Sequence, residues 1–172
     1  MGWTSTWDTS KSAMRHALDE WDGDLNFSVI KSSGKYHAIL DNRTGQRFAV
    51  VILTSSTKSE RAWKQIPETM GPTEAACPES ILRLLSPPEN DHAAEWRERC
   101  RAYNSKPDVN VGDTIELAKP ITFSDGVERS RFTRVKGSRF RGEDGQLVQL
   151  GRDWRHRNFT LVTPGLVASH ME

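Results

Sequence analysis

The chain has 172 residues, the length of one domain or of two small ones. Its hydrophobic fraction of 35%, with six Trp and six Phe, can fill a compact core, which excludes an intrinsically disordered chain. The net charge of +1 favours no class of partner by itself. The longest unbroken apolar run, Phe48–Leu53, is too short to span a bilayer, and the N-terminus lacks a signal peptide's apolar segment. We therefore expect a soluble, cytoplasmic protein with no membrane partner.

The N-terminal part has the pattern of a helix followed by an antiparallel sheet. Asp8, Thr9 or Ser10 can cap a helix whose apolar stripe continues to about Trp21. Three strands are predicted next, over Leu25–Lys31, Tyr36–Asp41 and Phe48–Leu53. The third is apolar on both faces, which is typical of a central strand covered on both sides. A short helix is then predicted over Glu60–Ile66.

Two further helices are predicted between the prolines of residues 68–103. Pro78 suits the first position of a helix that continues to about Leu85. Asn90 or Asp91 can cap a second helix. The buried face of this second helix is predicted to hold Ala93, Trp96, Cys100 and Tyr103. Its solvent side is predicted to hold Glu95, Arg97, Glu98, Arg99 and Arg101.

The C-terminal part has an all-β pattern after a polar linker at residues 104–110. Short apolar pairs alternate with turn signals such as Asp125-Gly126 and Asp144-Gly145, which predicts about five strands. The predicted fold class is α+β, a helix-flanked antiparallel sheet (residues 1–103) followed by a small SH3-like or OB-like β-barrel (residues 111–163). The tail, residues 164–172, has no pattern and contains Ser-His-Met, which resembles a cloning remnant.

Positive charge is concentrated in the second half of the chain. Residues 129–157 contain nine cations and three anions, a charge of +6, so the rest of the chain carries −5. Arginine interleaved with aromatic residues is typical of nucleic-acid-binding grooves. The candidate binding residues are Arg129, Arg131, Arg134, Arg139, Arg141, Trp154, Arg155 and Arg157. Three interpretations stay open: nucleic acid as partner, an acidic protein surface as partner, and a solvated basic face without one.

The two cysteines are the remaining candidates for site chemistry. Cys77, His92 and Cys100 fit no paired zinc-ligand spacing, so buried, reduced thiols are the expectation. Cys77 as a nucleophile with His37 or His92 as its base would also need an oxyanion site. No catalytic residue, metal ligand or cofactor is therefore predicted, and an enzyme of unknown type is the third alternative.

Several separated motifs carry a family resemblance over nearly the whole chain, from Met1 to about Val162. They are MGWTS, ETMGP, ACPESILRLLSP, AAEWRERC and VGDTIELAKPITFSDG. Together they resemble an uncharacterised domain family of phage, prophage and plasmid accessory proteins. The matching marked positions, which mostly suit structural roles, are Gly71, Pro72, Cys77, Pro78, Trp96, Arg97 and Cys100.

The resemblance implies no established activity, but it does imply that the protein belongs to a mobile genetic element and acts in the cytoplasm of a bacterial host. Small proteins of that setting handle DNA or counter host defence. We expect non-enzymatic nucleic-acid binding through the arginine-rich segment. The alternative is a protein inhibitor that docks on an acidic surface of a host factor.

Overall fold

The computed structural model describes residues 5–6, 10–54, 61–71, 74–151 and 153–162. The chain divides into two compact units, Met1–Ser105 (unit 1) and Lys106–Glu172 (unit 2). The helix caps proposed at Asp8 and Thr9, and the C-terminal tail, lie outside the described residues.

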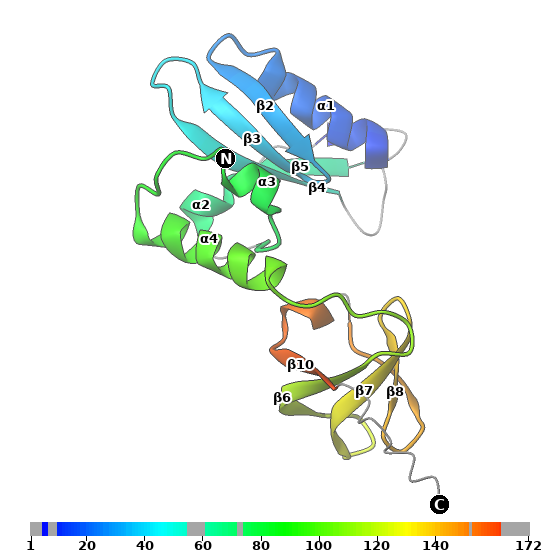
Figure 1. Ribbon diagram of the computed structural model, residues 1–172. Coiled ribbons are helices and arrows are strands. Elements are labelled where there is room, and N and C mark those ends of the chain that lie inside the picture. Colours follow the sequence, from blue (N-terminus) through cyan, green and yellow to red (C-terminus); the bar gives the residue numbers. More distant parts are fainter. Residues whose placement is uncertain (1–4, 7–9, 55–60, 72–73, 152, 163–172) are drawn as a thin grey trace, which may run out of the picture. The chain divides into compact units, whose positions relative to one another are not determined.

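Unit 1 contains one antiparallel sheet (Figure 1). Its strands are β1 (Ser5–Thr6), β2 (Phe27–Ser33), β3 (Tyr36–Asp41), β4 (Arg47–Thr54) and β5 (Arg61–Gln65). Their order in the sheet is β1-β5-β4-β3-β2, so β4 is central. Successive residues of β4 point to opposite faces, and both faces are buried. This confirms the predicted central strand.

One face of this sheet is covered by α1 (Ser10–Asp22). Ala13 and Ala17 of α1 are fully buried in a cluster with Val50 and Ile52 of the central strand. The small alanine side chains let the helix backbone approach the sheet closely. An edge-to-face aromatic group of Trp21, Phe27 and Phe48 continues this core.

The opposite face is covered by α2 (Pro67–Met70), α3 (Glu79–Leu82) and α4 (Asp91–Asn104). Trp96 and Cys100 of α4 are fully buried in this second core, as predicted. Asn90 caps α4, because its Oδ1 accepts a hydrogen bond from the Ala93 backbone N–H at 2.9 Å. Unit 1 is therefore the helix-flanked antiparallel sheet that the sequence predicted.

Two local predictions for unit 1 are wrong. Residues 61–65 form β5 rather than a helix, and Leu53 of β4 lies opposite Trp63. Ala62 is buried while Trp63 is half exposed, an alternation too short to recognise in the sequence. The helix that follows Pro78 ends at Leu82, and the chain then turns so that the Ser86 N–H bonds the Arg47 carbonyl of β4.

Unit 2 is built on a second antiparallel sheet. Its strands are β6 (Thr114–Thr122), β7 (Glu128–Lys136), β8 (Arg139–Gly142), β9 (Leu147–Gln149) and β10 (Phe159–Val162). The order is β10-β6-β7-β8-β9, and the described residues pair no β9 residue with β10. Five antiparallel strands are confirmed, but they form an open sheet and not the closed barrel that was predicted.

The core of unit 2 lies on one face of this sheet. Phe132 of β7 and Phe140 of β8 are fully buried there. Trp154, in the short 3-10 helix η1 (Trp154–His156), packs edge-to-face on Phe140 at 5.1 Å between ring centroids. Two hairpin turns depend on glycine, since Gly126 and Gly145 have φ of +77° and +80°.

Candidate functional site

Arg129 of β7 is enclosed by two acidic side chains. It is only 6% exposed and lies between two carboxylates, with Nε 2.9 Å from Asp144 Oδ2 and Nη2 2.8 Å from Asp125 Oδ2. These hydrogen bonds hold the pKa of both carboxyls below their usual range. Its guanidinium also lies 5.2 Å from the centre of the Phe123 ring. The charge of Arg129 is therefore used to join the β6–β7 and β8–β9 turns.

Arg134 is partly buried and contacts Trp154, which belongs to the core of unit 2. The Arg134 guanidinium donates to the carbonyl oxygens of Val109 and Gly137, and it lies 5.6 Å from the centre of the Trp154 ring. Trp154 itself is 7% exposed. Trp154, which the sequence suggested as a binding residue, is thus part of the core.

Arg155 and Lys106 hold each other's backbone in place. Arg155 Nη2 donates to the Lys106 carbonyl and to Asp108 Oδ1, both at 3.2 Å. Lys106 Nζ donates to the carbonyl oxygens of Arg155, His156 and Arg157 at 3.0 to 3.1 Å. Burial, then the nearby charge of Arg155, lowers the pKa of Lys106. The Arg157 side chain is exposed in the loop after η1, and Arg152 lies outside the described residues.

The remaining cations gather on the solvent face of β7 and β8. Because Phe132 and Phe140 point into the core, Arg131, Arg139 and Arg141 point outward. The register places Arg141 opposite Thr133, and Lys136 opposite Arg139. We define the β7–β8 cationic face as Arg131, Lys136, Arg139 and Arg141.

These four charges are weakly compensated. Arg131 pairs with Glu116 of β6 at 3.3 Å, and both side chains are about half exposed. An exposed pair of this kind contributes little and is screened by salt. Among the described residues, no carboxylate forms an ion pair with Lys136, Arg139 or Arg141. The face can therefore offer positive charge to an anionic partner.

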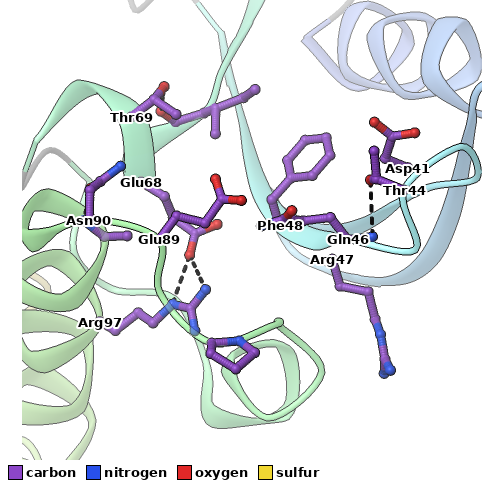
Figure 2. Close-up of a pocket in the computed structure, with 13 residues that line it drawn as sticks. Asp41, Thr44, Gln46, Arg47, Phe48, Glu68, Thr69, Glu89, Asn90 and Arg97 are labelled. Carbon is purple, nitrogen blue, oxygen red and sulfur yellow. Dashed lines mark hydrogen bonds and ion pairs between the residues drawn. The ribbon is translucent and has the colours of Figure 1, made fainter.

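Unit 1 contains a pocket of about 250 Å³ between the β3–β4 turn and the start of α4 (Figure 2). Its wall includes a buried ion pair between Glu68 and Arg97, which are 5% and 6% exposed. Arg97 Nε and Nη2 lie 2.7 and 2.5 Å from Glu68 Oε1, and Nη1 lies 2.6 Å from the Ser86 carbonyl. The other carboxylate oxygen of Glu68 accepts the Ala49 N–H at 2.8 Å. One pair thus ties α2, β4, α4 and the loop before α4 together.

This pair was not predicted, because the helical pattern of the sequence indicates the solvent side for Arg97. A weak signal was present: Arg97 lies four residues after Ala93 and directly after Trp96, at the border of the apolar stripe. Its partner Glu68 is 29 residues away, and no local pattern links the two.

The two thiols are free and buried, as predicted. Burial raises the pKa of Cys77 far above its usual value and that of Cys100 to about 11. A thiol in such surroundings keeps its proton at neutral pH, the opposite of an activated nucleophile. His92 is exposed on α4, whereas His37 is buried, with Nδ1 2.8 Å from Ser32 Oγ. Within the described ranges, no three His, Cys, Asp or Glu side chains could hold a metal ion.

Residues 87–159 match the model of a domain of unknown function (DUF6927). No curated protein and no solved structure matches the chain. The matched region is consistent with the expected uncharacterised family, and it contains the β7–β8 cationic face and the α4 side of the pocket. A phage origin stays a prediction.

No helix in the described part of the chain is long and apolar enough to cross a membrane.

Proposed function

We propose that the protein binds nucleic acid through the β7–β8 cationic face. The observation that carries the proposal is the gathering of Arg131, Lys136, Arg139 and Arg141 on one solvent face with a single exposed carboxylate partner. Arginine is well suited to this role, because its planar guanidinium donates two parallel hydrogen bonds to a phosphate. The proposed site is smaller than the eight residues predicted from the sequence, since Arg129, Arg134, Trp154 and Arg155 serve unit 2 itself.

The contacts we propose are mainly with phosphates. All five aromatic residues of unit 2 pack in or against its core, and none of them lies on the solvent face of β7 and β8 beside the four cations. Proteins that prefer single strands use such exposed rings for stacking. Duplex DNA carries a negative charge per about 1.7 Å of its axis, against about 3.4 Å along one strand. A purely cationic face should therefore favour duplex over single strands and show little preference for sequence.

This proposal suits the mobile-element setting that the family resemblance implies. An accessory protein of a phage, prophage or plasmid in a bacterial cytoplasm would meet duplex DNA at high concentration. Closure of the second sheet into an SH3-like or OB-like barrel is not required, because the cationic face lies on β7 and β8 alone.

The test is a fluorescence-anisotropy titration of a duplex and of a single strand of equal length, at about 50 and 200 mM salt. The variant Arg131→Gln/Arg139→Gln/Arg141→Gln removes three charges from the face. The control Arg15→Gln/Arg83→Gln/Arg99→Gln removes three exposed charges from i,i+4 ion pairs of unit 1. We expect the first variant to weaken duplex binding at least about tenfold and to reduce the log–log salt slope by about 2.7. Absence of binding at low salt, or equal losses in both variants, would refute the proposal.

The second candidate function is docking on an acidic protein surface. It is favoured by Leu147, which is 62% exposed and lies opposite Arg141 in the sheet register. An exposed apolar side chain beside an arginine is better suited to contact a protein surface than the phosphate backbone of a nucleic acid. Leu147→Gln should leave duplex affinity unchanged if nucleic acid is the partner. It should reduce recovery of a protein partner from nuclease-treated lysate if docking on protein is the function.

A further inference from the structure

We propose that the pocket of unit 1 binds a small organic cation, an alkylammonium or guanidinium group that carries a short apolar chain. This site is separate from the β7–β8 cationic face, and the inference does not depend on nucleic-acid binding. It rests on the shape, lining and charge of the pocket.

The apolar part of the lining comes from three elements. Phe48 of β4, Ile66 before α2 and Ala93 of α4 contribute to the wall, as does Pro87 from the loop before α4. An aromatic ring beside aliphatic groups can hold the chain of a ligand, and the ring face also attracts a cation. In Figure 2 the ring of Phe48 points toward the space between the two sides of the pocket.

The charged part of the lining leaves a negative excess. The guanidinium of Arg97 is bound to Glu68 and to the Ser86 carbonyl, so the positive charge at the wall is already matched by a carboxylate. Arg47 lies next to Phe48 on β4, and its side chain extends away from that ring (Figure 2). Arg47 is thus a lining residue whose guanidinium lies away from the Phe48 ring, the part of the wall proposed to hold the ligand.

Glu89 supplies the proposed counter-ion. It lines the pocket, and among the described residues its carboxylate forms no ion pair. Asp41, on the opposite wall, is held by Arg43 through a two-pronged contact at 3.1 and 3.2 Å. The carboxylate of Glu89 and the side-chain oxygen of Gln46 are thus the acceptors that a bound ammonium group would use.

The size of the pocket limits the ligand. A volume of about 250 Å³ lies just below the range of roughly 300 to 1,000 Å³ that is typical of ligand pockets, which favours a ligand with few non-hydrogen atoms. The apolar wall beside the single carboxylate of Glu89 suits an organic cation, because a metal ion needs several ligands and the described carboxylates form no such cluster. n-Hexylammonium has the right charge, length and apolar chain to serve as the probe.

The experiment is a proton–nitrogen NMR titration of the full chain with n-hexylammonium. We expect shifts of the amides of Phe48, Thr69 and Ala93 and a dissociation constant of about 1 mM or lower. 1-Hexanol and hexanoate, which match the chain but not the charge, should bind at least about fivefold more weakly.

Matched variants then assign the charge contact. Glu89→Gln should weaken n-hexylammonium binding at least about fivefold. Glu98→Gln, the same change at an exposed position of α4 outside the pocket, should change it less than about twofold. Both residues are exposed, so neither change should disturb the fold. An amide spectrum that matches the wild type away from the substituted residue verifies this for each variant. Failure of n-hexylammonium to shift the pocket amides, or equal affinities of the two variants, would overturn the inference.

Discussion

The two units use arginine in opposite ways. In unit 1, Arg97 is buried and fully engaged by Glu68 and the Ser86 carbonyl. In unit 2, Arg139 and Arg141 lie on the solvent face without a carboxylate partner among the described residues. Burying a charge costs several kcal/mol unless partners compensate it. An arginine whose charge is compensated by carboxylate and carbonyl groups of the same chain therefore stabilises the fold. An arginine without such groups is free to bind another molecule.

The same contrast exists within one strand. Arg129 and Arg131 are two residues apart on β7, yet one is enclosed by Asp125 and Asp144 and the other is half exposed. A count of charges along the sequence cannot distinguish them. The following substitutions compare compensated buried charges with exposed ones.

The largest effect is expected from Glu68→Gln, which leaves the buried guanidinium of Arg97 without its counter-ion. The free energy of unfolding, measured by urea denaturation, should fall by about 3 to 5 kcal/mol. Glu95→Gln is the matched control, because it breaks an exposed pair with Arg99 at 2.7 Å. That control should cost no more than about 0.5 kcal/mol. If the two variants had the same free energy of unfolding, the Glu68–Arg97 ion pair would not stabilise the fold of unit 1.

The next effect concerns His37, whose pKa burial lowers from 6.5 to about 4. The unfolded chain takes up this proton first as the pH falls, so acid favours unfolding. The contribution of neutral, buried His37 to the free energy of unfolding should be fully present above about pH 6.5. As the pH falls from about 6.5 to about 4, the free energy of unfolding should decrease by about 3 kcal/mol in total. Urea denaturation at several pH values should show this loss in the wild type and a smaller loss in His37→Gln. The control His92→Gln, at an exposed histidine, should keep the wild-type profile.

Arg129→Gln should lower stability without weakening nucleic-acid binding. The change leaves Asp125 and Asp144 without the guanidinium that joins their two turns. The urea midpoint of unit 2 should therefore decrease, while duplex affinity of the folded protein should stay within about twofold of wild type. A tenfold loss of affinity with unchanged stability would instead place Arg129 in the binding site.

Arg139→Gln should show the reverse behaviour and the smallest change in stability. No carboxylate in the described part of the chain pairs with Arg139, so the free energy of unfolding should change by less than about 0.5 kcal/mol. Duplex affinity should decrease severalfold in the anisotropy assay. A marked loss of stability would show that Arg139 has a structural partner.

The sequence allowed elements with clear local periodicity to be predicted. The strand at Tyr36–Asp41 and the central position of β4 follow from apolar patterning, and the start of α4 follows from the capping residue Asn90. β5 was missed because its alternation covers only five residues.

The candidate site was less predictable, because the partners of charged residues are distant in sequence. Arg97 and Glu68 are 29 residues apart, and Arg129 and Asp144 are 15 apart. Composition located the positive segment of unit 2, and alternation along the chain predicted that Arg139 and Arg141 share one face. The strand register shows which residues of β7 lie beside them.

The contacts of Lys106 determine where an expressed fragment of unit 2 should begin. Its ammonium group bonds three successive carbonyls at the end of η1, although it lies near the N-terminal limit of the unit. A fragment that starts after Lys106 would keep all five strands and still lose the clamp on that turn. An expression fragment of unit 2 should therefore begin upstream of this lysine, and chemical acetylation of its amine should loosen the same turn in the full-length protein.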